Sequence, residues 1–369
     1  MQKHLLVGNG LIIQYGGVEY NNESIINRTI ENVKNGRYED DMLKTLSPDD
    51  AHQFFILVKR EVRSIINGKY DQFALLPTEK EALLDFKIRY PKSKSFHSDV
   101  GFEDYFLILR LIFNKFKDSN ETRAGATTAL RRLFLDAIYN GGKINEIHGM
   151  FPAKLLGFLK NFKCIFTTNY DCNIENFTGM EVHHLHGQFD VLESVYDIDS
   201  LRNKISDKPA ENFNIPREYR HTYCNALMDF SKDFQFNMNK TVNVGLSKLA
   251  AAYKDNNKVR DDVNTWAGDS LHAVRNLYEG LMYKLDNPDV CFYDYSISKF
   301  QGIVGQLEVL GLSPKNDLHI LKIARDNSEL SLIKYYYFDK SDGDVVNEFF
   351  STKKIVLKNV RGLWEALTH

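Results

Sequence analysis

The stretch VGNGLIIQYGG, from Val7 to Gly17, places four glycines within ten positions, directly after the short apolar run KHLLV. Such a run followed by glycines predicts a buried strand that enters a tight turn. Further on, NNESIINRTIENVKNG carries isoleucine and valine at helical spacing, with Asn22 or Ser24 able to cap the start and Gly36 able to close the end. The glycines therefore join a strand to a helix, which is where open α/β sheets bind their ligands.

The rest of the chain alternates between helical blocks and short apolar runs. Ser47 before Pro48 and the pair Thr78 and Glu81 predict two helix starts within a long helical region. The runs KCIFTTNYD and EVHHLHG then predict two strands, and QLEVLGLSP, IKYYYFD and KKIVLKN predict three more, separated by helices. Strands that alternate with helices indicate a parallel sheet covered on both faces.

The fold class that we expect is α/β, a Rossmann-like parallel sheet with large helical insertions. Residues 1–46, 163–198 and 291–369 are expected to build the Rossmann-like domain. Residues 47–162 and 199–290 are polar and helical, and we interpret them as two insertions.

Composition limits the classes of partner. The 369 residues include 47 Lys and Arg against 49 Asp and Glu, and this net charge of -2 offers no basic surface for nucleic acid. The most hydrophobic helical run, YFLILRLIF, contains Arg110 and is too short to cross a bilayer. We therefore expect a cytoplasmic protein that binds neither nucleic acid nor membrane.

The cysteines do not predict a metal centre. The chain has four of them, Cys164, Cys172, Cys224 and Cys291, with no CxxC pair and no histidine at a zinc-ligand spacing. In EVHHLHG, His184 and His186 fall on one face of the predicted strand, so a metal site is the alternative interpretation. No carboxylate or cysteine stands at a fixed spacing from them, and we expect no bound metal.

The glycine turn has two interpretations. Gly8, Gly10 and Gly16 suit a turn where a pyrophosphate approaches the main chain at a helix N-terminus. However, the spacing is not G-x-G-x-x-G, and no acidic ribose-binding residue can be assigned about 20 positions on. The alternative is that the glycines only permit positive φ angles in a tight turn.

Four stretches in the same order resemble the sirtuin family. GNGLIIQYGG has the glycine spacing of the sirtuin signature G-A-G-x-S-x-x-x-G, TTNYD resembles T-Q-N-x-D, LHG follows like the sirtuin His-Gly, and GLSP resembles the G-T-S strand end. The chain departs from protein deacylases at Asn9 and Ile12, lacks the arginine of their PDFR motif, and has only Cys224 and Cys291 where they carry a four-cysteine zinc module. It therefore resembles the divergent bacterial sirtuin-like NADases of anti-phage defence.

The resemblance implies an NAD glycohydrolase that depletes NAD during abortive infection, with NAD as its substrate and no metal. Cleavage of the bond between nicotinamide and ribose passes through an oxocarbenium-like transition state. Asn169 offers donors and acceptors to the ribose and to a water, and His186 has the near-neutral pKa of a general base. The resemblance assigns NAD binding to Gly8, Asn9, Gly10, Gly16, Thr168, Tyr170, Asp171, Gly187, Gly311 and Ser313.

Several of these stretches also have simpler interpretations. NYD can be an Asx turn that closes a strand. Glu103 and Asp104 can reach the pocket or can merely complement a helix dipole, and Asp317 fits the same dipole interpretation. The aromatic run from Tyr335 to Tyr337 is most simply a core strand.

Two other functions remain open. An NAD-dependent deacylase or ADP-ribosyltransferase is disfavoured by the missing zinc cysteines, and a non-catalytic sensor or regulatory subunit that binds NAD or ADP-ribose is disfavoured by the presence of both Asn169 and His186. An NADase that is always active would kill its own cell. We therefore expect control by homo-oligomerisation or by an activating or inhibiting partner encoded nearby, with the two helical insertions as contact surfaces.

Overall fold

The computed structural model describes residues 2–38, 47–90, 97–117, 120–190, 217–227, 232–286, 288 and 296–368. The expected segment boundaries near residues 46, 198 and 290, and with them Cys291, lie outside the described residues.

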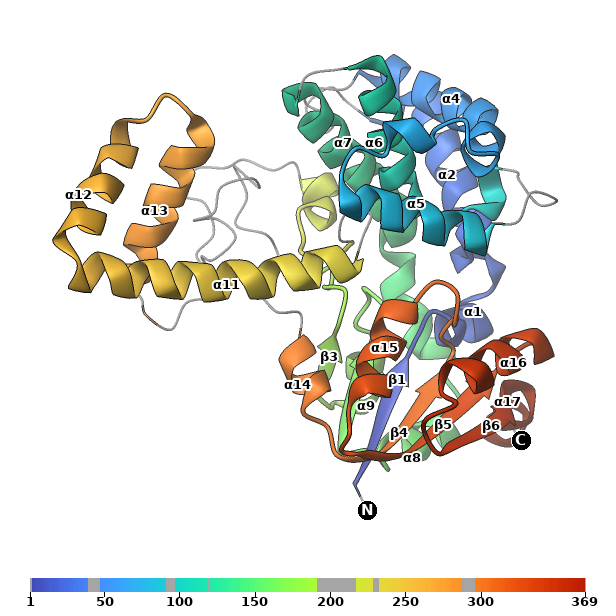
Figure 1. Ribbon diagram of the computed structural model, residues 1–369. Coiled ribbons are helices and arrows are strands. Elements are labelled where there is room, and N and C mark those ends of the chain that lie inside the picture. Colours follow the sequence, from blue (N-terminus) through green and yellow to red (C-terminus); the bar gives the residue numbers. More distant parts are fainter. Residues whose placement is uncertain are drawn as a thin grey trace.

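Six parallel strands form one sheet in the order β3-β2-β1-β4-β5-β6 (Figure 1). They are β1 (Lys3–Val7), β2 (Cys164–Thr167), β3 (Val182–His184), β4 (Gly305–Leu310), β5 (Leu330–Tyr337) and β6 (Ile355–Asn359). The predicted fold class is confirmed, because this is the strand order of Rossmann folds. The order reverses between β1 and β4, where such sheets open a ligand-binding crevice beyond the carboxyl ends of their strands.

Helices cover both faces of the sheet. Leu5 and Val7 point to one face, and Leu6 points to the other, because side chains alternate along a strand. The first face packs against α1 (Gly10–Gly16), α8 (Ala153–Leu159), α9 (Asn173–Thr178) and α17 (Val360–Thr368). The second face packs against α14 (Ile297–Gln301), α15 (Leu318–Asp326) and α16 (Lys340–Phe349).

A helical layer lies beyond the carboxyl edge of the sheet (Figure 1). It consists of α2 (Asn22–Lys34), α4 (Pro48–Ile66), α5 (Pro77–Arg89), α6 (Asp104–Phe116) and α7 (Asn120–Tyr139). Helix α2 packs against both α4 and α7, and the 3-10 helix η4 (Asn140–Met150) leads from α7 towards α8. The apolar core of this layer is continuous with that of the first sheet face.

The predicted cap is correct at α4 and wrong at α2. Ser47 and Asp50 form a capping box at the start of α4, with a proline in the first turn. Helix α2 is capped by Asn21, whose side chain accepts the Ser24 N–H at 2.8 Å, rather than by Asn22 or Ser24. Asn21 directly precedes the helix and has the extended main chain that an N-cap residue requires.

The starts of two further helices differ from the prediction. Helix α5 begins at Pro77, and the carboxylate of Glu79, not the predicted pair Thr78 and Glu81, accepts the main-chain N–H groups of residues 75 and 76. The glycine stretch is not only a turn, because α1 (Gly10–Gly16) lies inside it.

Helices α11 (Lys232–Asp255), α12 (Asn257–Thr265) and α13 (His272–Asp286) form an arm that projects from the rest of the chain in Figure 1. Leu246, Val263 and Leu281 give this arm an apolar core of its own. Among the residues that the structure describes, no helix combines the length and apolar character needed to cross a membrane.

Candidate functional site

A cavity of about 1110 Å³ lies between the carboxyl edge of the sheet and the helical layer. This volume slightly exceeds the usual range of small-molecule sites. Of the predicted site residues, those that line it are Asn9, Gly10, Thr168, Asn169, Tyr170, Asp171, His186, Gly311 and Ser313. We call this side, together with His319, the sheet wall. The helical wall consists of Ala82, Asp85, Arg89, Gly101, Phe102, Glu103, Asp104 and Leu107.

The first glycines let the loops that follow β1 and β4 touch. The N–H of Gly8 donates to the Leu310 carbonyl and that of Gly10 to the Gly311 carbonyl, both at 2.8 Å. A Cβ on Gly8 would lie 2.5 Å from the Gly311 oxygen, and one on Gly10 would lie 2.6 Å from the Gly311 Cα. Neither residue has a positive φ, so a positive φ is not what requires glycine at these two positions. Their N–H groups donate to the β4 loop, and their assignment to NAD binding stays a prediction.

Gly8, Gly16 and Gly187 are not among the described residues that line the cavity. A Cβ on Gly16 would lie 2.6 Å from the side chain of Ile147. Gly187 has a φ of +81°, and its Cβ would lie 2.1 Å from the Asn225 carbonyl oxygen. At positions 16 and 187, therefore, close packing of other parts of the chain leaves no room for a side chain.

Asn169 follows β2 and presents its side chain to the cavity. Its main chain is held on both sides, since its N–H donates to Thr167 Oγ1 at 3.0 Å and its carbonyl accepts His184 Nδ1 at 2.8 Å. The side-chain Nδ2 lies 3.5 Å from the Gly8 carbonyl, which is too long for a strong hydrogen bond. The amide is positioned by the main chain and can bind a ligand.

His186 faces His319 across the sheet wall. Both are buried, their rings stack at 15°, and their Nε2 atoms lie 2.9 Å apart. Two imidazole nitrogens at this distance share one proton, because one must donate and the other accept. The ligand atoms of Asp317 and of these two histidines lie within 4.8 Å of one another, so this group could also hold a metal ion.

Sequence reasoning missed His319 and gave Asp317 only a dipole role. Asp317 is the N-cap residue of α15 but makes no side-chain cap hydrogen bond, and it lines the cavity. The available signal was the position of both residues just after the GLSP strand end, at the same sheet edge as Asn169. Tyr335 to Tyr337 lie in β5, as predicted, and all three residues also line the cavity.

Tyr170 and Asp171 are buried beside Asn169. The Tyr170 hydroxyl donates to Glu103 Oε1 at 3.0 Å and so connects the two walls; burial, then the charge of Glu103, raises the pKa of Tyr170 well above its usual range. Asp171 Oδ1 accepts the Asn173 N–H at 3.0 Å, which is the Asx turn considered above. Its Oδ2 has no partner among the described residues, and burial raises the pKa of Asp171 to about 6.

Ion pairs hold the helical wall. Two nitrogens of Arg89 donate to the two carboxylate oxygens of Asp104 at 2.7 Å, and the Tyr90 hydroxyl donates to the same carboxylate at 2.8 Å. Asp104 is therefore the partner of a half-buried arginine as well as a first-turn residue of α6. Glu103 and Asp104 both line the cavity, as one of the two predictions had them.

His184 and His186 do not share a site. Strand β3 ends at His184, so the alternation that would place both side chains on one face stops before His186. The His184 imidazole lies 2.6 Å from Glu175 and is not among the described residues that line the cavity.

Comparison of the chain with protein-family models, with curated proteins and with solved structures returned no match.

Proposed function

We propose that this protein is an NAD glycohydrolase that converts NAD and water to ADP-ribose and nicotinamide. One observation supports this best: Asn169 and His186 follow two neighbouring strands and line one cavity next to the contact between Gly10 and Gly311. That contact lies where the strand order reverses, the place at which Rossmann folds bind dinucleotides.

The chemistry needs few groups. The bond between the nicotinamide nitrogen and ribose C1′ breaks, and nicotinamide leaves as a neutral molecule that requires no proton. A water adds to C1′, and His186 accepts the proton that this water loses. Asn169 holds the water and a ribose hydroxyl in line with the breaking bond, and its fixed main chain makes that arrangement reproducible.

In a cell, such an enzyme would act in the cytoplasm and deplete NAD after phage infection. Its activity must then be off before infection. A homo-oligomer or a partner protein encoded nearby would switch it, with the helical layer or the arm of α11 to α13 as the contact surface.

The decisive experiment measures NAD consumption by the purified full chain, alone and with the proteins encoded beside it, with the products separated by chromatography. Asn169→Ala and His186→Ala are each expected to slow cleavage by about 10²–10⁴-fold. Asn161→Ala and His52→Ala are the matched controls, because neither residue lines the cavity. The controls are expected to cleave NAD at the wild-type rate.

The other functions give different results. If NAD binds and survives under every condition, the protein is a sensor. If NAD is consumed only together with an acylated peptide or with ADP-ribosylation of a protein, it is a deacylase or an ADP-ribosyltransferase. Unchanged hydrolysis in both cavity variants would contradict the assigned roles.

A further inference from the structure

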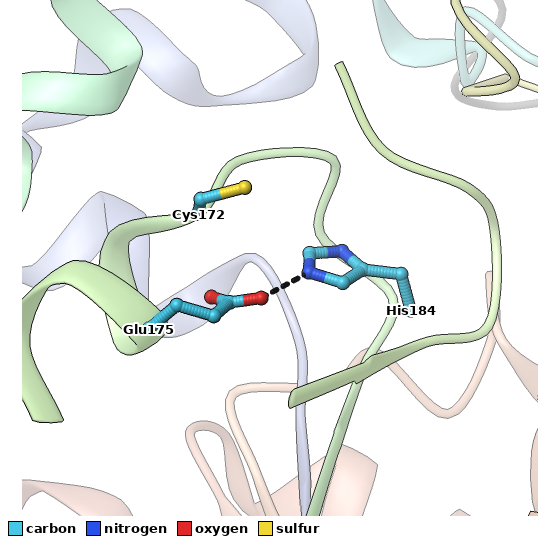
Figure 2. Close-up of side chains that lie close together, drawn as sticks. All are labelled: Cys172, Glu175 and His184. Atoms are coloured by element: carbon cyan, nitrogen blue, oxygen red, sulfur yellow. Dashed lines mark hydrogen bonds and ion pairs between the residues drawn. The ribbon is translucent and has the colours of Figure 1, made fainter. Parts of the chain in front are cut away.

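A second cluster of reactive side chains lies behind the Asn169 loop, outside the cavity. Cys172 precedes α9, Glu175 lies in the first turn of α9, and His184 is the last residue of β3; Figure 2 shows the three side chains pointing toward one another. Their ligand atoms lie within 4.8 Å of one another. The His184 side chain is 2% exposed, and the other two residues are half-buried.

The orientation of His184 is that of a metal ligand. Its Nδ1 lies 2.8 Å from the Asn169 carbonyl, which can only accept, so Nδ1 carries a proton. In the neutral ring, the lone pair of Nε2 then points at Glu175 Oε1, 2.6 Å away (Figure 2). Two acceptors at this distance need either a proton or a metal ion between them. A backbone carbonyl on the far nitrogen is the usual second contact of a metal-binding histidine.

The surroundings are rich in negative charge. Asp190 Oδ2 lies 3.0 Å from Cys172 Sγ, and the Asp171 carboxylate is close enough to interact with both His184 and Glu175. Glu175 Oε2 is buried and has no hydrogen-bond partner among the described residues. Among the described residues, neither Glu175 nor Asp190 forms an ion pair with a lysine or arginine.

We propose that Cys172, Glu175 and His184 bind Zn²⁺, with Asp190 as the fourth ligand. A thiolate, an imidazole and carboxylates are the ligands that Zn²⁺ prefers, in tetrahedral geometry with ligand atoms about 3.3–3.8 Å apart. The ligand atoms of Cys172, Glu175 and His184 already lie within 4.8 Å of one another, whereas Asp190, which contacts Cys172, must turn further towards the other two. On binding, the Cys172 thiol releases its proton to solvent and the sulfur coordinates the ion as a thiolate.

The ion would join α9 to β3 and, through His184, would hold the carbonyl of Asn169 in place. This effect on Asn169 rests on the proposed function, whereas metal binding itself does not. The sequence-based expectation of no metal considered only cysteines, histidines and carboxylates at regular spacings along the chain. The ligands here stand at positions 172, 175, 184 and 190, and the fold alone brings them together.

The test is Co²⁺ titration of the full chain after treatment with a chelator, with the absorption spectrum as readout. We expect one equivalent of Co²⁺ with the visible bands of a tetrahedral site and a near-ultraviolet band from sulfur to cobalt, both removed by Zn²⁺. Cys172→Ser should lose the sulfur band, and Glu175→Gln should weaken binding at least tenfold. Cys164→Ser is the matched control, a half-buried cysteine on β2 that should leave the spectrum unchanged.

Three results would overturn the proposal. The first is that Co²⁺ does not bind, in which case a proton alone joins His184 to Glu175. The second is binding without a sulfur band, which would point to His186, Asp317 and His319, a cluster that contains no sulfur. The third is that Cys164→Ser alters the band as much as Cys172→Ser does. The wild-type spectrum decides the question even if a variant fails to fold, and none of these readouts depends on NAD cleavage.

Discussion

The two walls of the cavity are held together by different kinds of contact. On the sheet wall, main chain bonds to main chain: the Gly10 N–H donates to the Gly311 carbonyl at 2.8 Å, and the Thr168 N–H donates to the Val7 carbonyl at 3.0 Å. On the helical wall, long side chains make the connections, with Arg89 bonded to Asp104 through two hydrogen bonds. The sheet wall therefore depends on which residues are small, and the helical wall depends on which charges are paired.

The largest effect is expected where a charge is removed from the helical wall. Arg89→Met leaves the Asp104 carboxylate, which is 9% exposed, without its cationic partner. We expect the free energy of unfolding to fall by about 3–5 kcal/mol, because an unpaired buried charge is costly. Urea denaturation measures it.

The control for that variant is another arginine of the helical layer. Arg60 pairs with Glu61 at 3.0 Å, but the Arg60 side chain is 70% exposed. Arg60→Met should change the free energy of unfolding by less than about 1 kcal/mol. If both variants lose the same free energy of unfolding, the ion pair of the helical wall contributes no more to stability than an exposed pair does.

Deeper in the helical layer, Asp136 makes stability depend on pH. Burial alone would raise the pKa of Asp136, but hydrogen bonds from His221 and Arg37 hold it below its usual value. The unfolded chain therefore binds more protons below about pH 4, and the stability contributed by Asp136 is lost as the pH falls through its folded pKa.

Asp136→Asn tests this contribution. At neutral pH we expect it to cost about 1.5–3 kcal/mol of stability, because hydrogen bonds to a buried charge are lost. Its unfolding free energy should then change less than that of the wild type as the pH is lowered from about 5 to about 3. If the unfolding free energies of the variant and the wild type change equally with pH, Asp136 is not the cause of the loss of stability in acid.

On the sheet wall, the sensitive property is the absence of a side chain. Gly311 has a φ of +68°, and an added Cβ would lie 2.9 Å from the Leu11 nitrogen. Gly311→Ala should lower stability by about 1–3 kcal/mol through backbone strain and displacement of α1. Thermal unfolding measures the change.

Gly157 provides a control of opposite sign. It lies within α8, is exposed, and a Cβ there would meet nothing within 4 Å. Gly157→Ala should therefore raise stability by up to about 1 kcal/mol, since alanine favours a helix more than glycine does. If both substitutions stabilise the protein, close backbone contact does not hold the sheet wall.

This difference also explains what could be predicted from the sequence. Gly8 and Gly10 mark the first strand end because close main-chain contacts leave room only for glycine, and the apolar runs predicted every strand of the sheet. Asn169 and His186 were singled out by the resemblance of two strand ends to sirtuin motifs, and both line the cavity. Why the glycines were required was not predictable, since their contact with Gly311 joins residues about 300 positions apart.

Contacts between charged or polar side chains could not be predicted from the sequence for the same reason. Arg89 and Asp104 are 15 positions apart and belong to two different helices, α5 and α6, and His186 and His319 are 133 positions apart. No periodic pattern encodes such pairs. Local rules also failed at the cap of α2, which is Asn21, and at the end of β3, which the prediction extended beyond His184 to include His186. The second error hid the separate environments of His184 and His186.

The smallest expected effect concerns the one imidazole pair of the sheet wall described above. If His186 acts as a base, His319 tunes and orients it through the 2.9 Å contact between their Nε2 atoms. His319→Gln keeps a polar group at that position, so we expect kcat for NAD cleavage to fall about tenfold, the equivalent of one hydrogen bond, with KM little changed. The pH profile of kcat should shift as well, because the proton that the pair shares is then held by His186 alone. Stability should change by less than in Arg89→Met. A variant that lost stability but kept both kcat and its pH profile would make His319 a packing residue, and would leave His186 to act without a partner from α15.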